Sequence, residues 1–462
     1  MFPTILLARA QFALIAAFHI LWPPVTIGLS IAMFVLEALW LVRGREFYYR
    51  QTRFWGRLFL LNFTVGVVTG IPMEFAFGDN WAPLSRYAGG LLGNLLGFEA
   101  VLAFMLEAAF IGLMVFGWGT IGRRMHLFAT GMVALGSSLS AFWIMDANSW
   151  MQTPGGIKRV HHHLIVTNYL HAILNRDLLL GFGHMYVACL VTGAAVLGTV
   201  SAWYLHHGRH TEFFLPMLKG AAVALAILGP LQILIGDSAG RALAKTQPAK
   251  LAAMEDRWRT NPPGHAASWV LLCWPNTKHR DNDWAVKIPK VGGLIITHHY
   301  RGGITGLDAF KRRDRPPVVI PFYAFRIMVV CGFYLALVGL WTAASSYRKR
   351  LTPERVNGHR RLLKAWYLML PAAYLAIECG WFTREVGRQP WVIYGILPTA
   401  RAVSSLPPAA LIGSLAGFFV FYALVGTVTF RYAYRILQKG PDLTSPIPVA
   451  ETRDHGLLTT LR

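Results

Sequence analysis

Several ionisable side chains interrupt long apolar stretches of this 462-residue sequence, and their types suggest redox or proton chemistry. An ionisable group is costly inside hydrocarbon, so each one is a candidate for function. Imidazole and thioether groups can ligate haem iron, and buried carboxylates can carry protons or bind a metal. The candidates are His19, Glu37, Glu74, Glu99, Glu107, His184 and Glu378, joined by the thioether of Met328.

The composition places these residues in a membrane protein. Hydrophobic residues make up 55% of the chain and charged residues 14%, which leaves too little polar surface for a soluble globule. The formal net charge is +22, but the Lys and Arg residues cluster between the apolar stretches. That pattern indicates membrane topology and contact with an anionic lipid bilayer, and no nucleic-acid partner is expected.

Nine apolar stretches are long enough to cross a hydrocarbon core of about 30 Å. They predict an all-α membrane protein with nine transmembrane helices. No small-residue cleavage site follows the first stretch, which argues against a removable signal peptide. The stretches fall near residues 15–42, 58–78, 91–118, 126–147, 179–205, 217–236, 320–345, 363–383 and 409–434.

Basic residues between the spans predict the orientation of the chain. Arginines crowd the gap after the first span, residues 43–57, and Arg and Lys crowd the gap after the seventh, residues 348–364. The positive-inside rule makes both gaps cytoplasmic. The N-terminus is then outside and the C-terminus inside.

The spans divide the chain into four parts. Residues 1–236 hold spans one to six, 237–319 form an external segment, 320–436 hold spans seven to nine, and 437–462 form a cytoplasmic tail. The external segment is too long for a simple connector, so we expect it to be folded. A second external stretch contains the run from His161 to His163, which is interpreted as a solvated loop in preference to a metal site.

The predicted orientation brings six of the candidate residues toward the external face. We expect early positions in odd-numbered spans and late positions in even-numbered spans to lie near that face, within a few turns of the helix end. A shared depth favours one buried cofactor site over scattered structural residues. These residues are His19, Glu99, His184 and Met328 in odd-numbered spans, and Glu74 and Glu378 in even-numbered spans.

Each candidate also has an ordinary structural interpretation. A single His can hydrogen-bond across a helix bundle, and Met328 can fill a core gap. Glu37 lies near the inner end of its span beside Trp40, which is typical of an interfacial carboxylate. Glu99 and Glu107 are about 80° apart around a helix and about 12 Å apart along it. They can form two stations of a proton path or be paired with other groups.

Eight sequence blocks between Arg9 and about Arg401 resemble subunit I of cytochrome bd-type quinol oxidases. The family fold consists of two four-helix bundles and a peripheral ninth helix, so the resemblance implies that arrangement for the nine spans. The block containing GRQPW is the most specific. The blocks are ARAQFALIAAFHILWPPVTIGL, GIPMEFAFGDNW, FEAVLAFMLEAAF, SAFWIMDANSWMQTP, HMYVACLVTGA, AKLAAMEDRW, FYAFRIMVVCGF and IECGWFTREVGRQPW.

The resemblance implies three haem groups and their iron ligands. His184 and Met328 resemble the axial ligands of a low-spin haem b, and the thioether favours ferrous iron. His19 and Glu378 resemble the ligands of two high-spin haems, in an order that stays open. One of these is a high-spin haem b. The other is haem d or a third haem b, because the short loop and Tyr374, where better-known members carry Trp, lean toward the cyanide-insensitive branch.

The same resemblance implies roles around the haems. Glu99 and Glu107 resemble carboxylates that serve the oxygen site and its proton supply. Arg326 and Arg388 resemble cations that balance haem propionates.

The long external segment resembles the quinol-binding loop of the family. On its KLAAME block, Lys250 would hold a quinol oxygen and Glu255 would accept its proton. The two residues are about 140° apart on a helix, so they need not neutralise each other. We expect Leu251 and Met254 to dock this segment on the membrane surface. The alternative is an ordinary surface helix with solvated charges.

These features predict a haem-containing subunit of a terminal quinol oxidase in a prokaryotic cytoplasmic (inner) membrane. It would oxidise membrane quinol at the external face and reduce dioxygen to water with cytoplasmic protons, without proton pumping. The family implies a second subunit, subunit II, with or without a small single-helix subunit. The alternative is a proton-coupled membrane transporter, which would lack haem absorption bands.

Overall fold

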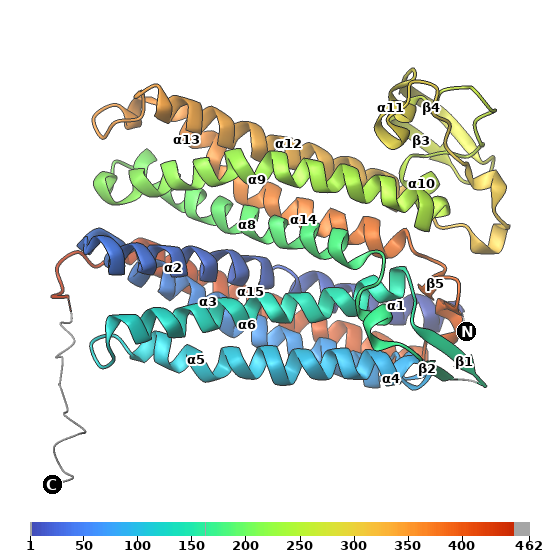
Figure 1. Ribbon diagram of the computed structural model, residues 1–462, viewed down its shortest axis with the longest axis horizontal. Helices are drawn as coiled ribbons and strands as arrows, with labels where there is room; N and C mark the ends of the chain where they lie inside the picture. Colours follow the sequence, from blue (N-terminus) through green and yellow to red (C-terminus); the bar gives the residue numbers. More distant parts are fainter. Residues whose placement is uncertain (1, 162, 448–462) are drawn as a thin grey trace, which may run out of the picture.

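The computed structural model describes residues 2–161 and 163–447, and long helices running side by side dominate it (Figure 1). Within these residues nine helical spans are long and apolar enough to cross a membrane, which confirms the predicted number. The spans are Thr4–Arg43, Glu46–Gly78, Ala82–Phe116, Arg123–Gln152, Leu178–His206, Thr211–Thr246, Arg312–Tyr347, Arg360–Val386 and Pro408–Lys439.

The first four spans form one bundle. Helix α2 packs against α3 and α6, and α5 packs against α6. Two of the four spans are built from more than one helix, because the chain bends before Pro23 and passes through a π-helix at Glu99–Phe104. The helices are α1 (Phe2–His19), α2 (Pro23–Arg43), α3 (Glu46–Gly78), α4 (Ala82–Phe98), η1 (Glu99–Phe104), α5 (Met105–Phe116) and α6 (Arg123–Gln152).

Spans five to eight form a second bundle, drawn above the first in Figure 1. Helices α8 and α12 each pack against both α9 and α14, so α8 and α12 occupy opposite corners of the bundle. The helices are α8 (Leu178–His206), α9 (Thr211–Thr246), α12 (Val319–Tyr347), α13 (Arg360–Tyr367) and α14 (Met369–Val386).

Small residues let the two bundles approach closely. Helices α2 and α8 cross at Gly28 and Gly193, where a Cβ atom on Gly28 would lie only 2.6 Å from Gly193 Cα. Small residues at such a crossing allow backbone-to-backbone packing inside a membrane. A larger side chain at either glycine would push the bundles apart.

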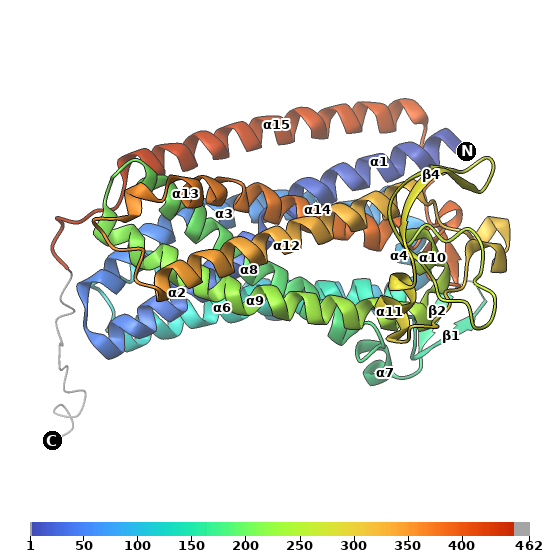
Figure 2. The same cartoon turned by 90° about the horizontal axis from the view of Figure 1, so that it is seen from above.

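The ninth span, α15 (Pro408–Lys439), lies at the periphery (Figure 2). It contacts α1 and α3, and Tyr422 stacks on Phe18 with ring centroids 4.4 Å apart. Two four-helix bundles and a peripheral helix are therefore confirmed.

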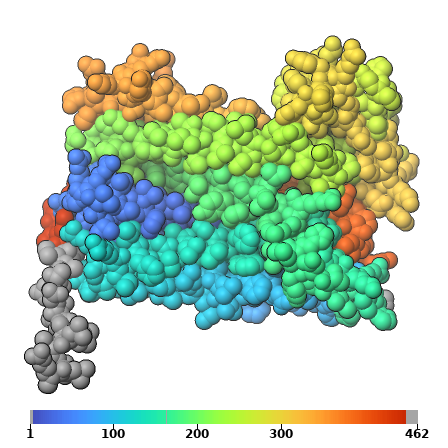
Figure 3. All heavy atoms as spheres, viewed as in Figure 1, coloured from blue at the N-terminus to red at the C-terminus, as the bar shows by residue number. Residues whose placement is uncertain are grey.

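Residues 247–318 form a folded segment that stands out from one end of the helices (Figure 3). We call this end the loop end and the opposite one the far end. The hairpin of β3 and β4 is antiparallel, and Leu251 packs among Ala267 and Ile304. The elements are α10 (Pro248–Met254), β3 (Trp269–Asn276), β4 (Asp281–Ile288), α11 (Val291–Thr297), η2 (Leu307–Ala309) and η3 (Arg312–Asp314).

Shorter elements complete the ends of the bundles. The strands β1 and β2 pair as a hairpin, as do β5 and β6. His161 and His163 lie at the β1–β2 turn, whereas His162, part of the predicted histidine run, lies outside the described residues. The elements are β1 (Ile157–Val160), β2 (His163–Val166), α7 (Tyr169–Ile173), η4 (Val356–Gly358), β5 (Trp391–Ile393), β6 (Leu397–Pro398) and η5 (Thr399–Arg401).

Several predicted boundaries were wrong. Helix α9 continues to Thr246, so the folded segment begins ten residues after the predicted position 237. Polar residues near the ends of these helices made the predicted apolar stretches shorter than the helices themselves. The first and third spans begin at Thr4 and Ala82, before the predicted 15 and 91. Helix α15 ends at Lys439, and residues 448–462 of the predicted tail lie outside the described chain.

Candidate functional site

His184 and Met328 come from the diagonal helices α8 and α12 of the second bundle. Each is half-buried and lies beside a glycine of an intervening helix. A Cβ atom on Gly236 of α9 would lie 3.2 Å from His184 Cε1, and one on Gly380 of α14 would lie 3.3 Å from Met328 Sδ. The bundle therefore keeps space beside both side chains.

The imidazole of His184 has an unused nitrogen. Its Nε2 lies 3.2 Å from Gln232 Nε2, while its buried Nδ1 has no hydrogen-bond partner among the described residues. A buried polar atom without a partner is unusual and costly. An imidazole nitrogen, a thioether and flanking glycines are groups that would suit a haem, whose iron both side chains can ligate.

His19 ends α1 and belongs to the first bundle. Its Nδ1 lies 3.0 Å from Thr69 Oγ1, and that hydroxyl donates its hydrogen to Val65 O at 2.9 Å. The hydroxyl must therefore accept from Nδ1–H, which leaves Nε2 as the unprotonated nitrogen that binds metals. A Cβ atom on Gly70 would lie 3.2 Å from the ring, so this glycine makes room for it.

Glu378 lies on α14 in the second bundle and is half-buried. Its Oε1 is buried without a hydrogen-bond partner in the described part of the chain. A carboxylate in that position suits a metal ligand or a proton carrier.

Glu99 and Glu107 both face serines of α6. Ser140 donates to Glu99 Oε1 at 2.7 Å, and Ser137 donates to Glu107 Oε1. The predicted separation of 80° assumed a regular α-helix and was wrong, because Glu99 begins the π-helix that leads toward Glu107. Single π-helical turns of this kind are frequent at functional sites.

The predicted common depth holds only in part. His19 and Glu99 lie close to the middle of their spans, because these spans begin earlier than predicted. His184, Glu378 and the exposed Glu74 lie nearer the loop end of their helices.

Glu37 is not an interfacial carboxylate, and that prediction was wrong. Glu37 is 1% exposed, and its Oε1 lies 2.5 Å from Nδ1 of His126, which is 2% exposed. Thr130 donates to Oε2 at 2.6 Å, and His126 Nε2 lies 3.0 Å from Met114 O. No apolar pattern marks His126 in the sequence, because it stands only three residues inside α6.

Lys250 of α10 is buried at the loop end. Its Nζ donates to Arg384 O at 2.8 Å and to Gln152 Oε1 at 3.2 Å. Burial, reinforced by the charge of Arg384, lowers the pKa of Lys250 to about 7.

Glu255 directly follows α10, and its partners differ from those of Lys250. Arg326 of α12 donates from Nη2 to Glu255 Oε2 at 2.8 Å and to Val270 O at 2.7 Å. The prediction that Leu251 and Met254 dock on the membrane surface was wrong. Both are buried, and Leu251 packs inside the folded segment.

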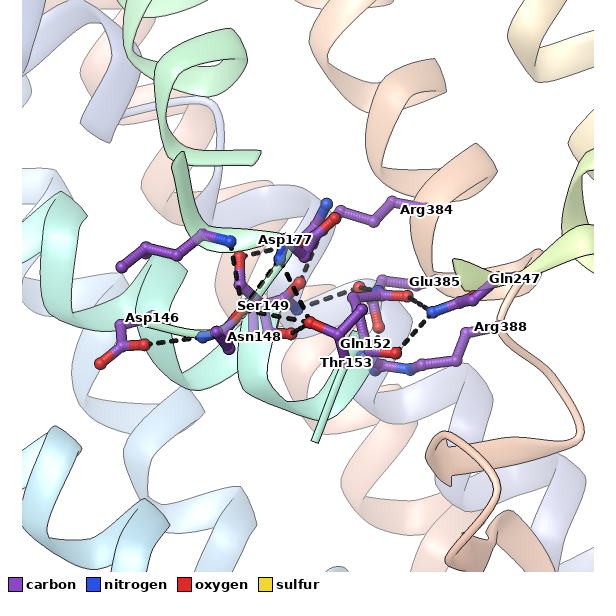
Figure 4. Close-up of polar contacts among 12 residues, drawn as sticks. Asp146, Asn148, Ser149, Gln152, Thr153, Asp177, Gln247, Arg384, Glu385 and Arg388 are labelled. Atoms are coloured by element: carbon purple, nitrogen blue, oxygen red, sulfur yellow. Dashed lines mark hydrogen bonds and ion pairs between the residues drawn. The ribbon is translucent and has the colours of Figure 1, made fainter. Parts of the chain in front are cut away.

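A polar cluster joins α6, α14 and the start of α8 (Figure 4), and Lys250 bonds to two of its members, Gln152 and Arg384. Arg384 donates to Asn148 Oδ1 at 2.6 Å and to Asp177 Oδ2 at 2.5 Å. Arg388 and the matched block that contains Asn148 were predicted from the sequence, whereas Arg384 and Asp177 had no predicted role. The feature of the sequence that could have revealed them is a run of polar residues at the ends of two spans. The remaining members include Ser149, Gln152, Gln247 and Glu385.

Arg388 provides cationic donors in this cluster. Its Nη2 donates to Glu385, whereas its buried Nε and Nη1 have no hydrogen-bond partner among the described residues. Burial lowers the pKa of Arg388 although the Glu385 carboxylate opposes that effect. Two free donors on a buried guanidinium suit an anionic group such as a haem propionate.

Comparisons with known proteins agree with this arrangement. The bd-II ubiquinol oxidase subunit 1 of Escherichia coli is 36% identical, covering 92% of this chain and 94% of its own. The bd ubiquinol oxidase subunit 1 of Bacillus subtilis is 34% identical, covering 95% and 94%. The bd oxidase structure from Geobacillus thermodenitrificans has a TM-score of 0.87 at 27% identity, covering 95% of this chain and 99% of that one.

The match to a protein family covers nearly the whole described chain. Residues 7–441 match the family described as Cytochrome bd terminal oxidase subunit I. This chain therefore belongs to the cytochrome bd terminal oxidase subunit I family.

Proposed function

We propose that this chain is the haem-binding subunit of a quinol:oxygen oxidoreductase in a prokaryotic cytoplasmic membrane. The observation that carries the proposal is the pair His184 and Met328, on diagonal helices of one bundle beside Gly236 and Gly380. When bound, haem supplies one-electron transfer and dioxygen binding. Membership of an oxidase family replaces the transporter alternative.

The chain offers ligands for three haem groups. His184 and Met328 would hold a low-spin haem b, and the unpartnered Nδ1 of His184 supports this role. His19, through the nitrogen left free by Thr69, and Glu378, through its unpartnered oxygen, would serve a high-spin haem b and either haem d or a third haem b.

Two arginines would balance the negative charge of haem propionates. Arg388 keeps two buried donors for a propionate. Arg326 is already paired with Glu255, so it would balance a propionate while holding that carboxylate in place.

Quinol oxidation would take place at the loop end, where α10 meets the bundles. Glu255 would accept the quinol proton, and Arg326 fixes the orientation of its carboxylate. Lys250 would hold a quinol oxygen, and the polar cluster positions its ammonium group. A general base and a cation at one site would favour loss of both quinol protons.

Protons for oxygen reduction would arrive from the far end. Glu107 and Glu99 bond to serines three residues apart on α6, about 4.5 Å along the helix axis, and so form successive stations. The arginine-rich gaps lie at the far end, so we place this end in the cytoplasm and the N-terminus outside. Consuming cytoplasmic protons conserves energy without a pump.

Subunit II of the family, with or without a small single-helix subunit, would complete the oxidase. The exposed Glu74 of α3 and the many exposed apolar side chains leave surface for such partners and for lipid.

Two measurements test the proposal. A reduced-minus-oxidised spectrum of the purified complex should show haem b, and a far-red band would identify haem d. In steady-state kinetics with a soluble quinol, Lys250→Ala and Glu255→Ala should each sharply reduce oxidation while haem content and reduction by dithionite stay normal. Wild-type rates in both variants would place the quinol site elsewhere.

A further inference from the structure

Gln152, the last residue of α6, occupies the point where α6, α10 and α14 meet. It is 2% exposed, and both ends of its amide are engaged. Its Oε1 accepts from Gln247 Nε2 at 2.9 Å and from Lys250 Nζ at 3.2 Å. Its Nε2 donates to Glu385 Oε1 at 3.2 Å.

These partners determine the orientation of the amide. An ammonium group is only a donor, so the atom of Gln152 that faces Lys250 must be oxygen. An ionised carboxylate is only an acceptor, so the atom that faces Glu385 must be nitrogen. Reversing the amide would lose both hydrogen bonds at once.

The ammonium group of Lys250 has only two hydrogen-bond partners in the described chain, and Gln152 provides the only side chain of the two. The other partner is the backbone oxygen of Arg384, which no side-chain change removes. The charged groups facing Lys250 are Arg384, Glu385 and Arg388 from the region of α14, and Asp177 from the start of α8.

We propose that Gln152 is a positioning residue for quinol oxidation, which fixes the Lys250 ammonium group against α14 and connects it to the Glu385 carboxylate. The proposal rests on the role given above to Lys250. Gln152 does not contact quinol in this scheme and acts only through Lys250.

The geometry has a consequence for the charge of Lys250. Hydrogen bonding to the charged form of a group favours that form, and burial opposes it. The pKa of Lys250 lies at about 7, so small changes in its partners alter its protonation near neutral pH. Gln152 would therefore influence both the place of the ammonium group and the fraction that is charged.

The test is the pH profile of quinol oxidation by the intact complex with a soluble quinol. Gln152→Leu removes an acceptor, so the limb near neutral pH should move to lower pH and kcat/KM should fall about tenfold or more. Gln152→Glu places one carboxylate oxygen beside Lys250 and the other against Glu385, so it adds negative charge next to the ammonium group, and the same limb should move upward by about 1–3 pH units. Haem spectra should remain those of the wild type.

Ser138→Ala is the control on the same helix, because the Ser138 hydroxyl bonds to Ala134 O and Tyr186 and contacts neither Lys250 nor its partners. Its profile should match the wild type. Repeating Gln152→Glu with Lys250→Met should abolish the upward movement.

Profiles that do not move in either Gln152 variant would overturn the proposal, as would a movement that persists without Lys250. Wild-type turnover in Lys250→Met alone would instead contradict the proposed function, so the two failures are distinguishable. If Gln152→Leu does not assemble, the comparison between the charged side chain of Gln152→Glu and the neutral amide of the wild type still decides the question.

Discussion

Arg326 of α12 and Glu255 of the folded segment form a buried ion pair, with Arg326 Nη2 2.8 Å from Glu255 Oε2. The same guanidinium donates to Val270 O on β3. One side chain of the bundle thus bonds to two separate parts of the folded segment. The ion pair therefore links the folded segment, which would bind quinol, to the second helix bundle, which would bind haem.

Replacing Arg326 with Met should loosen the folded segment. The change leaves the Glu255 carboxylate buried without its cation, at a cost of about 3–5 kcal/mol. Thermal unfolding should shift downward and proteolysis of residues 247–318 should accelerate. Arg241→Met is the control, because its pair with Asp237 is partly exposed and contributes about 0–1 kcal/mol. Equal behaviour of the two variants would contradict the expectation.

His184→Ala and Met328→Leu should each remove or convert the low-spin haem, since each deletes one of the two proposed axial bonds. Optical and electron paramagnetic resonance spectra of the purified complex provide the measurement. Met33→Leu changes a buried methionine of α2 and should leave the spectrum intact. A six-coordinate low-spin spectrum of full intensity in either variant would show that the ligand assignment is wrong.

Glu107→Gln should slow oxygen reduction about 10²-fold or more, because an amide cannot carry the proton. Quinol should still reduce the low-spin haem at the normal rate, so rapid-mixing spectroscopy can separate the two steps. Ser138→Ala is a matched control on α6, because the Ser138 hydroxyl bonds to Ala134 O and Tyr186 and, within the described residues, to no carboxylate. Unchanged oxygen reduction in Glu107→Gln would mean that protons use another path.

Glu37→Ala should destabilise the far end of the first bundle. The change leaves Nδ1 of the buried His126 without its carboxylate partner, and Thr130 keeps only its bond to His126 O. Leaving a buried polar group without its hydrogen-bond partner costs about 1–3 kcal/mol. Glu46→Ala, which removes an exposed partner of Arg50, should have little effect on the unfolding temperature. Equal unfolding temperatures would show that the His126 contact contributes nothing.

Lys250 should make stability depend on pH. Its pKa falls from 10.5 to about 7 on burial, so the unfolded chain binds more protons than the folded chain between these values. Stability therefore rises with pH across this window, because the buried group becomes neutral. The difference in unfolding temperature between the wild type and Lys250→Met should change in favour of the wild type from pH 7 upward. A constant difference would mean that Lys250 titrates normally.

The sequence alone determined the architecture. Nine spans follow from apolar length, since a bilayer core requires about twenty apolar residues in a helix whatever the tertiary contacts. The matched sequence blocks around His184, Met328 and Glu378 were enough to predict the family. Each block is a run of neighbouring residues, so it can be recognised without knowledge of the fold.

Only the tertiary structure decided which side chains meet. Glu37 and His126 are 89 positions apart, and Lys250 and Gln152 are 98 apart, so no local pattern links them. Such pairs depend on how each helix is rotated about its axis and on its depth in the bundle. The π-helix that begins at Glu99 changes the direction in which later side chains point, and a regular helical period does not predict that change. Helix ends also escaped prediction, because polar residues such as Arg9 and Gln11 are compatible with a helix once neighbouring helices shield them from lipid.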